Sequence, residues 1–334
     1  MQTEEAKNPE QKASLKSSFW RLSKGQKRQK GLMKKLAGAV AIVLIAAIVL
    51  IVAWAEMRTT RVEIESATQK KTLVKIRGGE WPSPLAGGEK LRLYAECAAF
   101  SEDVYDRKDP TIKPPSGWGQ IIHDTPNYPP DQRRIDWSKI DPKNGVQAPE
   151  FAFKVWEKPA QDQVNLVIAF RGTDDRKDWT SNFRWFTRKI TGKEDQYDWV
   201  RKMMPQLMDI IHQRHQGKQL RIVTTGHSLG GGLAQHAAYT TDEIKEVYAF
   251  DSSPVTGYYD IEERKKNSLG KKIDRIYERG EILSYARSLL RPFYELSEKD
   301  PNITEIGFNF TKGSWAGEQH SMTDLAKNLQ EAAR

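Results

Sequence analysis

One serine lies between glycines in the segment Thr225–Leu233, whose sequence is TGHSLGGGL. Gly226 and Gly230 stand two residues on either side of Ser228, the G-x-S-x-G spacing of a serine held on a sharp turn between a strand and a helix. Such a turn leaves no room for a Cβ atom at the glycines, and backbone N–H groups at the start of the helix can stabilise negative charge. Ser228 is alternatively a simple helix N-cap, but a cap does not explain glycines on both sides. We therefore interpret Ser228 as a nucleophile.

The turn must be preceded by a strand and followed by a helix, and the sequence predicts both. The apolar segment 220–224 is typical of a strand, and 229–239 predicts a helix whose small residues pack closely on a sheet. The nearly continuous apolar segment 164–170 predicts a strand buried on both faces. We expect further strands at 151–155, 247–250, 273–277 and 306–310. We expect further helices at 91–105, 198–216 and 321–333, and mostly loop over 110–149. This alternation predicts an α/β fold with a mainly parallel sheet and helices on both faces.

Four motifs in combination resemble the class 3 lipase family of α/β-hydrolases. They are VIAFRGT at 167–173, Asp178-Trp179, GHSLGG at 226–231 and the HSM that begins at His320, and the likeness covers roughly residues 94–329. The resemblance implies the α/β-hydrolase fold and a serine hydrolase. It also implies that Thr173, which follows FRG, supplies one donor of an oxyanion hole, with the N–H of Leu229 as the second. The alternative for Thr173 is a simple turn residue.

The general base is sought among six histidines. His227 belongs to the turn itself, and His236 lies two turns along the next helix. α/β-Hydrolases carry their triad in the order Ser, acid, His, which disfavours the three histidines that precede the serine: His123, His212 and His215. His320 follows at a distance, just before the last expected helix. We predict that His320 is the base; the alternative is a surface or helix-capping histidine.

Two carboxylates are candidates for the acid that orients the base. Glu281, in the segment 276–283 (IYERGEIL), falls where the resembled family has the aspartate of Asp-Ile-Val, so glutamate here is a departure from the family pattern. Asp251 directly follows the expected strand 247–250, a position also used for acids in open α/β sheets, but it is alternatively a structural part of the turn that ends at Pro254. We favour Glu281 and keep Asp251 as the runner-up.

Aromatic and basic residues are interleaved directly after Thr173. In the resembled family this region includes a lid that covers the serine in water and moves aside at a lipid surface. The lid and interface candidates are Trp179, Phe183, Trp185 and Phe186. Aromatic rings among basic side chains suit an anionic membrane interface. Trp179 and Phe183, four residues apart, have the alternative role of packing their helix against the core.

The N-terminal part of the chain predicts a membrane anchor. Leu36–Ala55 is twenty residues long without one charge, and such a helix rises about 30 Å, enough to cross the hydrocarbon core. The basic tail 1–35 precedes the span, which places the N-terminus in the cytoplasm and the catalytic domain on the extracytoplasmic side. The alternative is a signal peptide cleaved near Ala55, where Ala53-Trp54-Ala55 has the small-x-small pattern. We expect a polar stalk over 56–80 and the hydrolase domain over 81–334.

Charge and composition narrow the function further. Ten basic and three acidic residues in 1–35 account for +7 of the net charge of +9, so the rest of the chain is close to neutral and nucleic-acid binding is not expected. The sequence has neither a Cys/His cluster nor a G-x-G-x-x-G after a strand, so we expect no metal and no organic cofactor. The prediction is a membrane-anchored serine hydrolase of lipid acyl esters, phospholipid or acylglycerol. The alternatives are a hydrolase of soluble esters or thioesters and a catalytically inactive membrane scaffold.

Overall fold

The computed structural model describes the chain in segments, and it divides the chain into two units, 1–57 and 58–334. The described residues are 33, 36, 39–47, 50, 59–67, 69–108, 110–124, 135–140, 151–172, 195–284, 287, 301–311 and 318–334. In the first unit, residues 39–47 are helical and exposed. None of the helices in these described segments is both long and apolar enough to cross a membrane. Because much of 36–55 lies outside the described residues, the membrane anchor stays a prediction.

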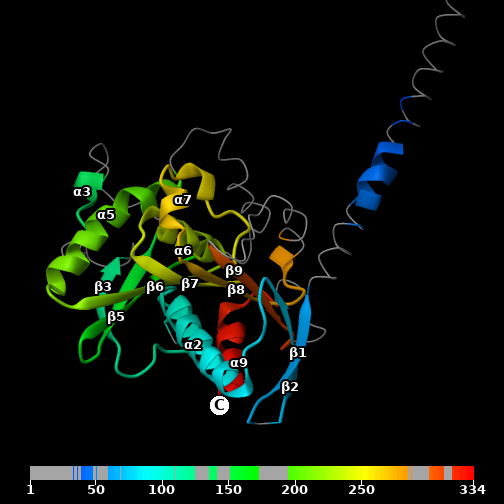
Figure 1. Ribbon diagram of the computed structural model, residues 1–334, viewed down its shortest axis with the longest axis horizontal. Coiled ribbons are helices and arrows are strands. Elements are labelled where there is room, and N and C mark those ends of the chain that lie inside the picture. The colour runs from blue at the N-terminus through cyan, green and yellow to red at the C-terminus, as the bar shows by residue number, and fades with distance from the viewer. Residues whose placement is uncertain are drawn as a thin grey trace, which may run out of the picture. The chain divides into compact units, whose positions relative to one another are not determined.

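One sheet of nine described strands forms the centre of the second unit (Figure 1). The five central strands run parallel, and an antiparallel pair extends the sheet on each side. In spatial order the strands are β1 (Thr60–Glu65), β2 (Lys71–Arg77), β9 (Asn302–Phe308), β8 (Lys272–Glu278), β7 (Ile244–Phe250), β6 (Gln219–His227), β5 (Gln163–Phe170), β4 (Phe153–Pro159) and β3 (Gly119–Asp124). The expected α/β fold with a parallel centre is confirmed.

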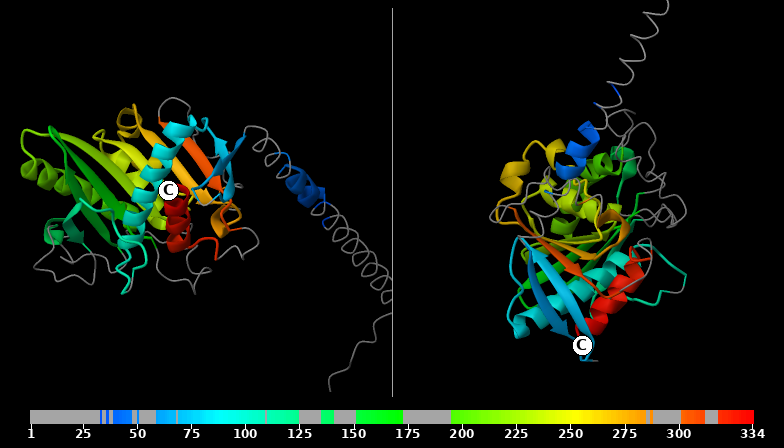
Figure 2. Two further views of the ribbon diagram at one scale, coloured as in Figure 1. Left: turned by 90° about the horizontal axis from the view of Figure 1, so that it is seen from below. Right: turned by 90° about the vertical axis from the view of Figure 1, so that its right-hand side faces the viewer.

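Helices cover both faces of the sheet, as the alternating sequence pattern predicts (Figure 2). α2 (Pro84–Asp103) and α9 (Met322–Ala332) lie side by side on one face, and α5 (Gln196–Arg214) and α6 (Leu229–Thr240) cover the other. Short helices of the second unit include α3 (Trp137–Ile140), η3 (Tyr258–Asp260) and α7 (Arg264–Asn267), and residues 282–284 are also helical. α5 begins with a capping box between Asp195 and Asp198, and α9 begins at Ser321, whose side chain accepts the N–H of Asp324.

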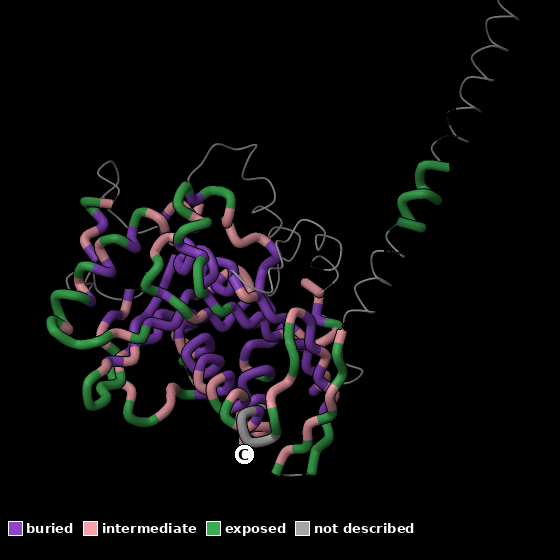
Figure 3. Tube along the Cα trace, viewed as in Figure 1, coloured by how far each residue is buried: buried purple, intermediate pink, exposed green. Residues whose placement is uncertain are grey.

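The sheet is buried on both faces, which explains the continuous apolar run in β5 (Figure 3). Successive side chains of a strand point to opposite faces. Val167 and Ala169 therefore join the core beneath α2 and α9, whereas Ile168 and Phe170 join the core beneath α5 and α6. The strands that carry the candidate site are held between two apolar layers.

Strands β1 and β2 pair as a hairpin within the range 56–80, where we expected a separate polar stalk. β2 pairs with β9, so the hairpin extends the sheet. Charged residues alternate with apolar ones in this segment, and Val74 and Ile76 are buried in the core while Glu63, Glu65 and Lys71 are exposed. The second unit therefore begins before residue 81. β3 and α3 likewise form within 110–149, where we expected mostly loop.

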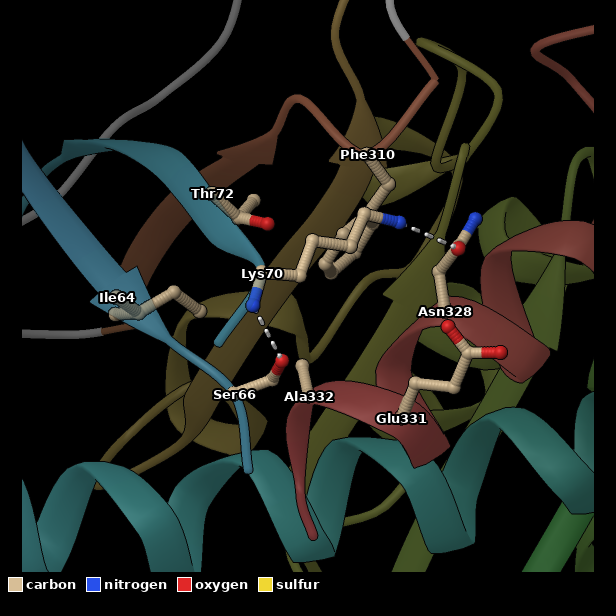
Figure 4. Close-up of a pocket in the computed structure, with 8 residues that line it drawn as sticks. All are labelled: Ile64, Ser66, Lys70, Thr72, Phe310, Asn328, Glu331 and Ala332. Atoms are coloured by element: carbon tan, nitrogen blue, oxygen red, sulfur yellow. Dashed lines mark hydrogen bonds between the residues drawn. The ribbon is translucent and has the colours of Figure 1, made fainter. Parts of the chain in front are cut away.

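A shallow pocket lies between this hairpin and α9 (Figure 4). Lys70 crosses it, donating from Nζ to Oδ1 of Asn328 at 3.5 Å and lying 5.9 Å from the centre of the Phe310 ring. Its lining residues are Ile64, Ser66, Lys70, Thr72, Phe310, Asn328, Glu331 and Ala332. Since no expected catalytic residue lines this pocket, the candidate active site lies elsewhere.

Candidate active site

Ser228 forms the turn between β6 and α6, with φ +57° and ψ −124°. A positive φ is unusual for a residue with a Cβ atom and marks backbone strain that the surroundings must hold. Hydrogen bonds from neighbouring backbone groups hold both the N–H and the carbonyl of Ser228 in place. The Ser228 N–H donates to the carbonyl of Phe250 at 3.0 Å, and its own carbonyl accepts the N–H of Ser253 at 2.9 Å. The strand, sharp turn and helix required by the G-x-S-x-G spacing are all present.

The glycines of the motif permit a close approach of three elements. A Cβ atom on Gly226 would lie 2.4 Å from the carbonyl carbon of Gly230, and one on Gly230 would lie 2.2 Å from the carbonyl oxygen of Phe170. Both contacts are with backbone, which cannot move aside as a side chain can. The absence of side chains here lets α6 begin directly against the ends of β5 and β6.

The end of β5 comes close to the serine. A Cβ atom on Gly172 would lie 3.3 Å from the Cβ of Ser228 and 2.6 Å from the hydroxyl of Tyr105. Leu229 is the first residue of α6, so its N–H is among those that have no acceptor within the helix. Thr173, the other expected oxyanion donor, lies outside the described residues. The oxyanion hole stays a prediction, although the chain leading to Thr173 passes beside Ser228.

His320 and Glu281 meet although 39 residues separate them. Nδ1 of His320 lies 2.8 Å from Oε2 of Glu281, which also accepts the N–H of Leu283 at 2.8 Å. Glu281 follows β8 through Gly280, whose φ is +92°, and His320 directly precedes the N-cap of α9. The carboxylate fixes one ring nitrogen of the histidine, which leaves Nε2 as the atom that would exchange a proton.

Arg287 completes the surroundings of Glu281. Its Nη2 bonds Oε1 of Glu281, and its Nη1 donates to the carbonyl of Ser252 at 2.8 Å. Burial by itself would raise the pKa of Glu281, but the charge of Arg287 and the hydrogen bond with His320 outweigh it and hold that pKa below its ordinary value. Glu281 is therefore a carboxylate at neutral pH. Nothing in the sequence marked Arg287, because a spacing of six residues from Glu281 is not a helix-face pair.

Asp251, the runner-up acid, is placed differently. It is fully buried just after β7 with φ +39°, and its Oδ1 accepts the N–H of Glu278 at 2.9 Å. Burial and the nearby charge of Glu281 raise the pKa of Asp251 well above its ordinary value, which favours its neutral form. Glu281, and not Asp251, bonds Nδ1 of His320.

The position of His320 relative to the serine turn follows from His227. The two imidazole rings lie 4.6 Å apart between centroids, inclined by 43°. His227 directly precedes Ser228, and its Nδ1 lies 3.0 Å from the hydroxyl of Tyr105. His320 therefore lies beside the serine turn. Tyr105 is a second residue that no sequence signal indicated, since its approach to His227 spans 122 residues.

Comparison with known proteins decides the family. The model of a Tle-like phospholipase domain, described as phospholipase-like, matches residues 96–286, more than half of the chain. The chain belongs to this family. The match includes Ser228 and Glu281 and ends before His320. The sequence motifs resemble the class 3 lipases, and the family that the comparison shows is phospholipase-like, so the expectation of a lipase or phospholipase family is confirmed.

Individual relatives of this phospholipase-like chain are distant. An extracellular phospholipase A1 of Serratia liquefaciens is 36% identical over 93 residues, which is 28% of this chain and 25% of that protein. The chain thus matches about a quarter of the length of this curated relative. Lipase II from Rhizopus niveus has 16% identity and a TM-score of 0.35, covering 62% of this chain and 77% of the lipase. The Rhizomucor miehei lipase in its propeptide complex has 13% identity and a TM-score of 0.35, with 64% and 67% covered.

Apart from His227 and His320, the histidines of this phospholipase-like chain are bonded away from the serine turn. His123 bonds Asp106 at 3.0 Å, His212 pairs with Glu243 at 2.7 Å, and His236 bonds the carbonyl of Thr256 at 3.0 Å. His215 pairs with Glu157 at 3.0 Å. These contacts agree with the choice of His320. The lid candidates Trp179, Phe183, Trp185 and Phe186 lie outside the described residues.

Proposed function

We propose that this chain is a serine hydrolase of lipid acyl esters, with Ser228, His320 and Glu281 as its triad. One observation carries the proposal. The hydrogen bond between His320 and Glu281 holds an imidazole, ordered by a buried carboxylate, beside the strained turn of Ser228. A nucleophile on a strand–helix turn and a base oriented by an acid are the parts that acyl transfer requires.

The proposed mechanism assigns each residue one task. Nε2 of His320 accepts the proton of the Ser228 hydroxyl as Oγ attacks the ester carbonyl, and the imidazolium then protonates the leaving alcohol. Glu281 accepts the Nδ1–H and stabilises the imidazolium, while Arg287 keeps Glu281 ionised. The N–H of Leu229 and the donors of Thr173 bind the oxyanion. Water, activated by His320, then hydrolyses the acyl-enzyme.

The substrate we propose is the acyl ester of a phospholipid or an acylglycerol. The phospholipase-like family and the phospholipase A1 relative support it. We further propose that Trp179, Phe183, Trp185 and Phe186 form an interfacial lid, and that 36–55 anchors the domain on the extracytoplasmic side of a membrane. Cleavage near Ala55 and export is the alternative to the anchor.

Release of fatty acid from phospholipid vesicles tests the proposal. We expect the full chain to hydrolyse vesicle lipid faster than short monomeric esters, and Ser228→Ala to lower kcat by roughly 10⁶-fold, as loss of a triad serine does elsewhere. Ser138→Ala, in the short helix α3, is the matched control and should keep the wild-type rate.

Two results would refute parts of this proposal separately. Hydrolysis that survives in Ser228→Ala would remove Ser228 as the nucleophile. A clear preference for monomeric esters or thioesters, with Ser228 still required, would keep the mechanism and reject the lipid substrate. Absence of any hydrolysis by the wild-type chain would favour a binding scaffold.

A further inference from the structure

Three buried side chains that can ligate a metal converge beside the serine turn. They come from separate segments: His227 ends β6, Asp251 follows β7, and His320 precedes α9. One potential ligand atom from each lies within 4.8 Å of the other two. Their exposed fractions are 6%, 0% and 7%, so bulk water does not occupy the space between them freely.

We infer that His227, Asp251 and His320 bind a Zn²⁺ ion. Two imidazoles and one carboxylate are a nitrogen and oxygen donor set that suits Zn²⁺, with a fourth position left for water. A tetrahedron with bonds of about 2.1 Å separates its ligand atoms by about 3.4 Å. The three atoms, now within 4.8 Å of one another, therefore need to approach by at most about 1.4 Å.

The side chain of Asp251 supplies an independent reason for a cation at this place. Asp251 is fully buried, and among the described residues its Oδ2 has no hydrogen-bond partner, while Oδ1 is occupied by the N–H of Glu278. A buried polar atom without a partner is costly, and groups left this way in native proteins call for an explanation such as a bound ion. Zn²⁺ at this position would satisfy Oδ2.

Both imidazoles are already oriented as metal ligands are. Metal-bound histidines donate their second ring N–H to an acceptor, often a carboxylate, which fixes the ring and raises its basicity. His320 has Glu281 at 2.8 Å from Nδ1, and His227 has the hydroxyl of Tyr105 at 3.0 Å from Nδ1. With Nδ1 of each ring bonded in this way, we assign Nε2 as the nitrogen that binds Zn²⁺.

The consequence, which rests on the proposed function, is reversible inhibition by Zn²⁺. The lone pair on Nε2 of His320 that would accept the proton of Ser228 is the one that binds the metal. Zn²⁺ and catalysis therefore exclude each other, and removal of the metal by a chelator restores hydrolysis. Ser228 is not a ligand, so binding itself does not depend on the nucleophile.

The closing experiment measures Zn²⁺ binding by calorimetry on the full chain carrying Ser228→Ala, which removes any effect of turnover. We expect one Zn²⁺ per chain. Adding His227→Gln should weaken binding at least 10-fold, as should Tyr105→Phe, because partners of metal-bound histidines typically contribute 10- to 100-fold. His212→Gln, on α5 and paired with Glu243, is the matched control and should bind as the parent does. With the serine present, Zn²⁺ should abolish hydrolysis and EDTA should restore it.

Unsaturable binding, or equal affinity in the parent, His227→Gln and Tyr105→Phe, would overturn the site. If His227→Gln does not fold by circular dichroism, Tyr105→Phe decides, since it removes only a hydroxyl. Failure of the two proposals is distinguishable. If the wild-type chain hydrolyses no ester but binds one Zn²⁺, with an affinity that these substitutions lower, the proposed hydrolase is refuted and the metal site stands. If the chain is active and Zn²⁺ does not change its activity, only the metal site is refuted.

Discussion

Two buried carboxyl groups lie close to His320, and hydrogen bonding separates their roles. Glu281 accepts from Nδ1 of His320, and Arg287 balances its charge. Asp251 instead accepts the backbone N–H of Glu278, the last residue of β8. The residue that resembles the family acid is thus also the residue that contacts the imidazole.

Substitution of each carboxyl by its amide tests this division. Glu281→Gln keeps the shape of the side chain, but the amide is a poorer acceptor of the His320 Nδ1–H than the carboxylate. The substitution also favours the tautomer of His320 that cannot act as a base. We therefore expect kcat to fall by about 10⁴-fold. Asp251→Asn leaves that acceptor in place and should lower kcat far less. Steady-state kinetics on a lipid ester compares the two. A larger loss in Asp251→Asn would move the role of acid to Asp251.

At the scale of elements, the site depends on how closely α6 approaches β5 and β6. The strained φ of Ser228 persists because backbone groups on β7 and after it hold both its N–H and its carbonyl. The helix start lies so near the strand ends that Gly230 has no space for a Cβ. Packing of these elements, not the turn sequence by itself, therefore maintains the geometry of the serine.

Gly230→Ala should separate these elements. Its Cβ would meet the carbonyl oxygen of Phe170 at 2.2 Å, so we expect the free energy of unfolding to fall by about 1–3 kcal/mol or more, together with activity. Gly88→Ala in α2 is the matched control. Nothing lies within 4 Å of its Cβ position, and it should be neutral or stabilise by about 0.5–1 kcal/mol. Urea unfolding measures both; equal effects would contradict the close approach.

At the scale of the whole molecule, the stability of the second unit includes a buried lysine distant in sequence from the triad. Lys271 is 1% exposed, and its Nζ donates to the carbonyls of Thr241, at 2.9 Å, and Ile244. Burial lowers the pKa of Lys271 from its ordinary 10.5 to about 7. Between these values the unfolded chain keeps a proton that the folded chain releases, so this group makes stability rise with pH in that window.

Lys271→Met removes this pH dependence. From pH 7 to 9, we expect the free energy of unfolding of the wild type to rise relative to that of Lys271→Met by at most about 1.4 kcal/mol per pH unit. Denaturant titrations at pH 7, 8 and 9 measure the difference. Lys272→Met, at the exposed neighbouring position, removes the same charge and is the control. The pH dependence of its free energy of unfolding should be the same as that of the wild type. A difference that stays constant with pH would rule out titration of Lys271.

The sequence by itself determined the parts of this protein whose signals are local. The apolar run of β5 and the glycines around Ser228 are dictated by burial and by lack of space, and both conditions appear in a short stretch of chain. The motif resemblance placed Glu281 and His320 on segments that the structure joins by a hydrogen bond. The chemistry of these residues stays a prediction, as do the anchor and the lid.

Only the tertiary structure decided which distant groups meet. The contacts of Arg287 with Ser252, of Tyr105 with His227, and the convergence of His227 with Asp251 and His320 depend on sheet order and on where each loop returns. The hairpin β1–β2 likewise owes its place to pairing with β9, more than 200 residues further along the chain. Sequence patterns report the burial of one segment, whereas these contacts arise from the register between segments, which no single segment encodes.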